Sequence, residues 1–167
     1  MPAVPDWALA LTFWIHFLAA VTLVGSLVAT SVLILPAAGT LNPLDQLNLM
    51  ATLQKRMEPA AWFSLSLLIV TGLFQMSLNV HYNGFLSVSN QWTVAILVKH
   101  ILVVTMIVVS AVQSWDVLPT ARRLLLRKDK ASQDEASKLQ RREARLLRAN
   151  LILAVLILAA TAFMRAA

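Results

Sequence analysis

Apolar residues in this chain fall in four long continuous stretches, and none of them alternates between apolar and polar residues as a membrane barrel strand does. Each stretch is close to, or longer than, the roughly 20 mostly apolar residues with which a helix crosses a bilayer. The pattern therefore predicts an all-α fold, a four-helix transmembrane bundle that forms one integral membrane domain over residues 1–167. The predicted spans cover about residues 7–36, 59–79, 91–115 and 149–164.

The composition supports a membrane protein and excludes most soluble classes. Hydrophobic residues make up 59% of the chain and charged residues 13%, whereas soluble domains average roughly 45–50% and 25%. The absence of cysteine excludes disulfides, thiolate metal sites and iron–sulfur clusters. The sequence has no H-E-x-x-H motif and no glycine-rich phosphate loop. Whether the protein is an enzyme is left open, and any activity is expected to be that of an oxidoreductase.

The charges of the connections predict the orientation of the bundle. Residues 116–148 contain ten Lys and Arg, residues 37–58 contain two, and residues 80–90 contain none. Because basic connections stay in the cytoplasm, we expect an N-out, C-out protein in a bacterial or archaeal cytoplasmic membrane, in contact with lipid. After a turn at Leu118-Pro119, the basic segment is predicted to be a solvated cytoplasmic helical extension of the fourth span, and no nucleic acid is expected to bind it.

Ionisable groups inside the predicted spans are the candidate functional residues, because such groups are costly at membrane depth. His16 lies nine residues after Trp7, and His100 lies nine residues after Gln91. Each is therefore about 13 Å from the outer end of its helix, and the two helices run in the same direction. The spacing predicts two imidazoles at one depth in the outer leaflet, where a metal or cofactor can bind between facing helices.

The neighbours of the two histidines complete the predicted site. Lys99 is expected to pair with a haem propionate or to snorkel outward, and small residues one turn from His16 leave room for a flat ring. Trp14 fits either a cofactor pocket or an outer aromatic belt. His81, in the connection 80–90, is expected to be dispensable for binding of the main cofactor. The predicted cofactor-binding residues are His16, His100, Lys99, Ala19, Ala20 and Trp14, with His16 and His100 as the metal ligands.

Three functions remain open from the residues alone. The paired histidines favour a membrane b-type cytochrome that binds haem b and exchanges electrons with a quinol, a periplasmic carrier or a larger complex. The alternative is a copper-handling or transport protein in which the histidines are transient ligands. The third is a cofactor-free accessory subunit of a larger complex or a homo-oligomer. The spaced methionines are expected to fill the core: Met50, Met57, Met76, Met106 and Met164.

Three short segments resemble the copper resistance protein D-like (CopD-like) membrane family over roughly residues 12–115. The first is H-x(8)-G from His16 to Gly25, the second is Arg56 followed by Thr71-Gly72-Leu73, and the third is Lys99-His100. This resemblance implies copper handling by a helical membrane protein. An early histidine and a later lysine are also distantly similar to the haem-containing membrane protoporphyrinogen oxidases, which implies b-type haem.

Overall fold

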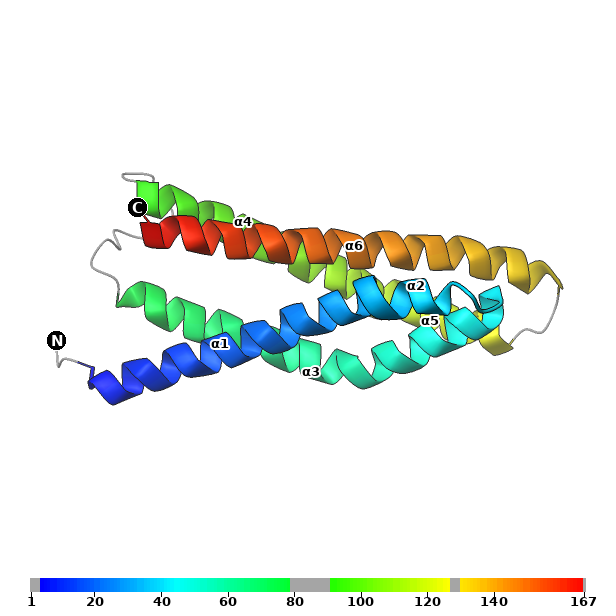
Figure 1. The fold of residues 1–167 in the computed structure, drawn as a ribbon, viewed down its shortest axis with the longest axis horizontal. Helices are drawn as coiled ribbons and strands as arrows, with labels where there is room; N and C mark the ends of the chain where they lie inside the picture. The colour runs from blue at the N-terminus through cyan, green and yellow to red at the C-terminus, as the bar shows by residue number, and fades with distance from the viewer. Residues whose placement is uncertain (1–3, 79–90, 127–129, 167) are drawn as a thin grey trace.

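The protein is described here by a computed structural model that covers residues 4–78, 91–126 and 130–166, and this part of the chain is helical with no strand (Figure 1). Two π-helical segments, Ala29–Ile34 and Gln113–Val117, join α1 to α2 and α4 to α5 without a break. The helices are α1 (Asp6–Val28), α2 (Leu35–Ala38), α3 (Pro43–Ser77), α4 (Gln91–Val112), α5 (Leu118–Leu126) and α6 (Lys130–Ala166).

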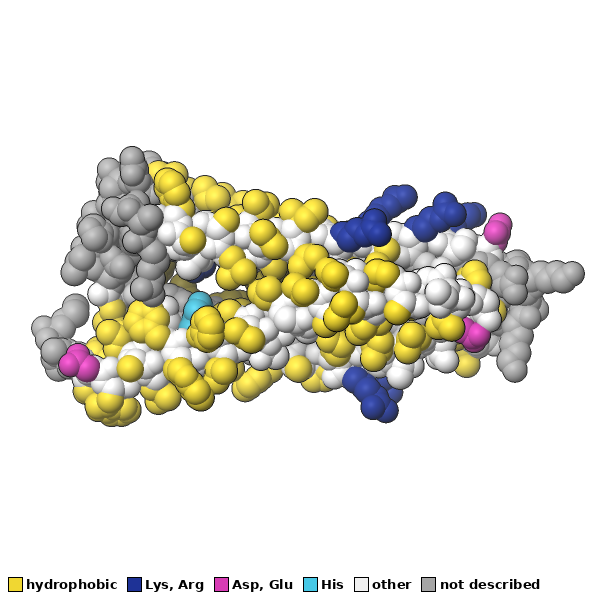
Figure 2. Space-filling model, viewed as in Figure 1, with side chains coloured by type: hydrophobic (Ala, Val, Ile, Leu, Met, Phe, Trp, Pro, Cys, Tyr) yellow, Lys and Arg dark blue, Asp and Glu magenta, His cyan; other side chains and the backbone are white. Residues whose placement is uncertain are grey.

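Four helical rods of the described chain are long and apolar enough to cross a membrane. The predicted all-α, four-helix transmembrane bundle is therefore confirmed. Apolar side chains cover much of the outside of the bundle, where they contact lipid (Figure 2). Phe17 and Phe63 are among the large apolar side chains that are exposed. The four rods are Asp6–Ala38, Pro43–Ser77, Thr93–Leu126 and Asp134–Phe163.

The bundle is built from two pairs of helices. α1 packs along α3, α4 packs along α6, and α3 joins the pairs through its contacts with α5 and α6 (Figure 1). α1 begins and α6 ends at the same end of the bundle, which we call the termini end. The opposite half carries the exposed Lys and Arg side chains (Figure 2), and we call its extremity the basic end.

The predicted connection 37–58 is wrong, because most of it is the first part of α3. Asn42 caps this helix: its Oδ1 accepts a hydrogen bond from the backbone N–H of Asp45 at 2.9 Å. Pro43 occupies the first helical position, where a missing N–H costs nothing. Only residues 39–42 separate α2 from α3, so the second span begins well before residue 59.

The turn predicted at Leu118-Pro119 is also wrong. The π-helical segment Gln113–Val117 comes directly before this pair and leads into α5. A π-helical turn is wider than an α-helical turn, because its hydrogen bonds join residues five apart. The wider turn relieves the clash of the proline ring with the preceding turn. The helical extension of the fourth span is confirmed, since α6 runs without interruption from Lys130 to Ala166.

Two apolar clusters hold the helix pairs together. The first lies at the basic end and joins α3, α5 and α6, and the second lies in the middle of the bundle and joins all four spans. The first cluster contains Leu47, Ala51, Val117, Leu118, Ala121, Leu124, Ala136 and Leu139. The second contains Leu23, Leu65, Met106 and Ala154.

Candidate functional site

His16 is oriented by helix α3. Its Nδ1 lies 2.7 Å from Oγ1 of Thr71, and a Cβ added to Gly72 would lie 3.5 Å from Cε1 of the ring. The hydroxyl of Thr71 donates its single proton to the carbonyl of Leu67. Nδ1 of His16 therefore donates to Thr71, and Nε2 carries the lone pair. A histidine with this assigned tautomer is able to bind a metal through Nε2.

The second predicted ligand, His100, bonds within its own helix. Its Nδ1 donates to the carbonyl oxygen of Ile96 at 2.8 Å, and because a carbonyl only accepts, Nε2 of a neutral His100 carries the lone pair as well. The hydrogen bond of His16 therefore reaches the neighbouring helix α3, whereas the bond of His100 to Ile96 stays within α4. Binding of one group by both histidines stays a prediction.

Lys99, on α4, and His16, on α1, lie on different helix pairs. The positive charge of Lys99, on α4, reaches the imidazole of His16, on α1. Figure 2 shows a hollow between the two pairs toward the termini end, with a histidine side chain inside it. Lys99 is half-buried, so its side chain is not fully exposed to lipid.

The other predicted site residues differ in their surroundings. Ala19 is buried and Ala20 is half-buried. Trp14 is 64% exposed, which fits the aromatic belt better than a cofactor pocket. His81 lies outside the described residues.

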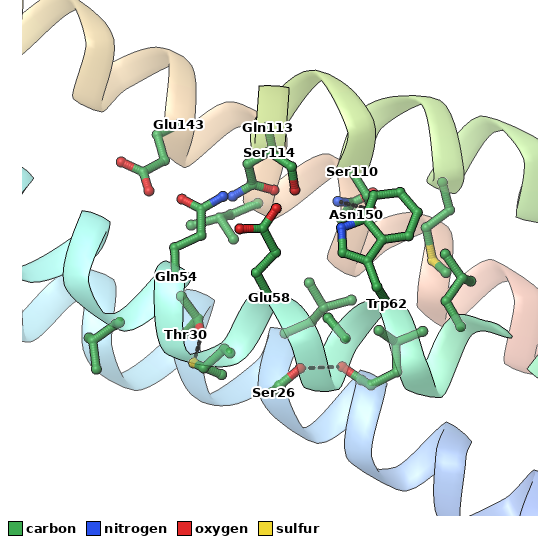
Figure 3. Close-up of a pocket in the computed structure, with 18 of the residues that line it drawn as sticks. Ser26, Thr30, Gln54, Glu58, Trp62, Ser110, Gln113, Ser114, Glu143 and Asn150 are labelled. Atoms are coloured by element: carbon green, nitrogen blue, oxygen red, sulfur yellow. Dashed lines mark hydrogen bonds between the residues drawn. The ribbon is translucent and has the colours of Figure 1, made fainter. Parts of the chain in front are cut away.

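A second candidate site is a cavity of about 100 Å³ between the two apolar clusters (Figure 3). Gln54 and Glu58 extend from α3 toward Gln113, while α6 contributes Glu143, on the far side of Gln54 from Glu58, and Asn150, beside Ser110. All four spans contribute polar side chains to its wall. These are Ser26, Thr30, Gln54, Glu58, Ser110, Gln113, Ser114, Glu143 and Asn150.

Three of the four spans depart from regular α-helix geometry at this cavity. The π-helical segments Ala29–Ile34 and Gln113–Val117 both contribute lining side chains. Pro59 lies inside α3 next to Glu58, and because it has no N–H, the carbonyl of Lys55 lacks its usual helical partner. α3 bends along its length (Figure 1). Such irregular turns occur frequently at functional sites, since they redirect side chains.

The two carboxylates of the cavity have no cationic partner within the described ranges. Glu143 is only 3% exposed, and Glu58 is half-buried. The single ion pair found among the described residues joins Arg142 to Asp116 at 2.7 Å, and both of its side chains are about half exposed. A buried carboxylate without a partner is costly, and either a bound proton or a cation that enters the cavity removes this cost.

Asn150 is a buried side chain with an unused acceptor. It is 2% exposed, and its Nδ2 donates to Oγ of Ser110 at 3.1 Å. Its Oδ1 is buried and has no hydrogen-bond partner. An unsatisfied buried polar atom costs about 1–3 kcal/mol, so this oxygen is available to a ligand that enters the cavity.

Three of the methionines also line the cavity. Sδ of Met57 lies 4.0 Å from the hydroxyl of Thr30, which donates to it, and Met50 and Met106 are buried. No group of three or more His, Asp or Glu side chains suited to a metal is found in the described part of the chain. A metal in either candidate site would also need amide, hydroxyl, thioether or water ligands.

The cavity is not predicted by the sequence, because Glu58 falls in a predicted connection and Glu143 in a predicted solvated extension. The burial of Glu143 corrects the second prediction. A helical signal was nevertheless present: Gln54 and Glu58 are four residues apart, and Glu143 and Asn150 are seven apart. Each pair therefore shares one face of its helix. This signal is useful only once residues 43–58 are known to be helical.

Comparison with known proteins relates the chain to a protein family. The chain matches the family described as Copper resistance protein D (CopD) over residues 51–164, while no curated protein and no solved structure matches it. The match covers more than half of the chain, including most of α3 and all of α4, but it does not include α1 with His16. It relates the chain to copper and gives no support to the haem b, cytochrome or electron-transfer interpretation. This multi-pass cell-membrane protein, with its four apolar spans, belongs to the copper resistance protein D (CopD) family.

Proposed function

We propose that this protein handles copper in the membrane: it binds copper ions transiently inside the bundle and passes them along it. The observation that carries the proposal is the CopD match over residues 51–164. Copper is the cargo in this proposal and is not a resident cofactor. The polar groups enclosed by four apolar spans support it, because an ion that crosses a bilayer needs ligands that replace its water.

His16 and His100 are the proposed transient ligands toward the termini end. The partners of their Nδ1 atoms support this role, because they favour the tautomer in which Nε2 has the lone pair. Lys99 limits the strength of binding, since its positive charge reaches His16 and repels a bound cation. A weak site suits a transported ion, which must leave as readily as it enters.

A visible spectrum and a copper titration of the purified full-length protein test this function against a resident haem. We expect no haem absorption bands and a measurable affinity for copper that falls in both His16→Ala and His100→Ala. His81→Ala is the matched control and is expected to bind copper as the wild type does. A protein that purifies with a six-coordinate haem spectrum, or that binds copper in neither oxidation state, contradicts the proposal.

A further inference from the structure

We propose that the polar cavity between the two apolar clusters is a second site for the copper cargo, and that it takes the ion as Cu²⁺ through oxygen ligands. Glu58 and Glu143 supply the negative charge, and Asn150 supplies a neutral oxygen. The identity of the ion rests on the proposed function. The existence of the site rests on the side chains that line the cavity.

Within the described part of the chain, the only ionisable side chains in the cavity wall are acidic. No Lys, Arg or His is among the described residues that line the cavity, whereas the positive charge of Lys99 acts on His16. Glu58 and Glu143 each carry a negative charge when ionised, and a divalent ion in the cavity offsets this charge. The surrounding apolar clusters keep the local dielectric low, so the attraction between this pair and a cation is weakly screened.

Asn150 independently provides a buried oxygen without a hydrogen-bond partner in the described ranges. Its Oδ1 is an acceptor for which the described residues provide no donor, although its Nδ2 is fixed by Ser110. Nearly every buried polar atom of a folded protein has a partner, and the exceptions need an explanation. Asn150 lines the same cavity as Glu58 and Glu143, so a cation that enters the cavity supplies the missing partner.

The chemistry of the lining favours the divalent state of copper. Carboxylate, amide and hydroxyl oxygens outnumber the sulfur atoms in the cavity wall, and among first-row divalent ions Cu²⁺ binds such nitrogen and oxygen ligands most tightly. The soft thioethers of Met50, Met57 and Met106 would select Cu⁺. Met57 already accepts from Thr30, so a Cu⁺ site built on the methionines is the competing outcome of the test.

The two sites are far enough apart to be measured separately. Thr71, which holds His16, and Glu58 are thirteen residues apart on α3, which corresponds to about 20 Å along a helix. The first site contains imidazole nitrogen and the cavity contains none. Electron paramagnetic resonance of bound Cu²⁺ resolves coupling to nitrogen, so it distinguishes copper bound at the two places.

The experiment uses the full-length protein without its three histidines, His16→Ala, His81→Ala and His100→Ala, titrated with copper(II). We expect one bound Cu²⁺ whose spectrum has no nitrogen splitting. Glu58→Gln or Glu143→Gln should weaken this binding about tenfold or more, at least as much as the loss of a metal's outer-shell partner does. Glu135→Gln, at an exposed position of α6, is the matched control and should bind copper as the parent does.

A second measurement covers the case in which the histidine-free protein does not fold. In the chain that keeps its histidines, the same glutamine substitutions should remove the oxygen-only component of the spectrum and leave the nitrogen-split component. Copper binding that is unchanged in both glutamine variants overturns the cavity site. So does binding that occurs only as Cu⁺ and is lost in Met57→Leu. If the nitrogen-split component alone is present, the cavity proposal fails while the proposed function stands.

Discussion

At the scale of single residues, the hydroxyl of Thr71 determines which nitrogen of His16 is available to a metal. The depth of His16 could be predicted from the rise of a helix, because it depends only on counting residues. Its partner on α3 could not, because the rotation of each helix about its axis is set by packing across the bundle. Thr71 and Gly72 lie in the segment that resembles the CopD-like second helix, and the structure shows that both meet His16.

Replacing this hydroxyl tests its role. Thr71→Val keeps the shape of the side chain but removes the partner of His16 Nδ1, so the ring loses its fixed orientation and tautomer. We expect copper to bind about 10–100-fold more weakly, the usual effect of losing an outer-shell partner. Thr161→Val is the control, since its hydroxyl bonds only to the carbonyl of Ile157 in its own helix. Equal copper affinity in the two variants would refute this role for Thr71.

At the scale of the elements, the sequence predicts which segments cross the membrane better than where each helix starts. The four apolar stretches correspond to four helical rods. A stretch of apolar residues indicates only the part of a helix that faces lipid. Residues 43–58 contain charged and polar side chains, so the apolar pattern does not predict the early start of α3. The Asn42-Pro43 pair, a cap followed by a proline at the first position, was the local signal for that start.

A core substitution tests whether residues 43–58 are packed as a helix. Leu47 is fully buried in the cluster at the basic end, whereas Leu49 on the same helix is 38% exposed. Leu47→Ala should lower the free energy of unfolding by about 2–5 kcal/mol through lost contacts and the cavity left behind. Leu49→Ala should change it much less. Thermal unfolding in detergent measures both, and equal effects would indicate that this segment does not pack as α3 does here.

The π-helical segments and Pro59 are a second feature that periodicity could not reveal. A π-helical turn has no residue pattern of its own, and it becomes visible only when the backbone is traced. Both segments contribute side chains to the wall of the same cavity, and Pro59 lies next to Glu58 in that wall. The histidines of the first candidate site could therefore be predicted from the sequence. The cavity with Glu58 and Glu143 could not, because it depends on how the helices pack.

At the scale of the whole molecule, the distribution of charge predicts the orientation in the bilayer. The chain has no cysteine, so a single introduced cysteine reports on one position. With the basic segment in the cytoplasm, Ser132→Cys should resist an impermeant thiol reagent added to intact cells and should react after permeabilisation. Asp6→Cys, at the exposed start of α1, should react from the outside. Labelling of Ser132→Cys in intact cells would reverse the orientation.

Passage of copper through the bundle is tested by copper accumulation inside sealed vesicles that contain only the purified protein and lipid. We expect copper added outside to accumulate faster than in protein-free vesicles. We also expect His16→Ala and Glu58→Gln each to slow the accumulation, and His81→Ala and Glu135→Gln to leave it unchanged. Accumulation at the protein-free rate by folded wild-type protein would contradict the account.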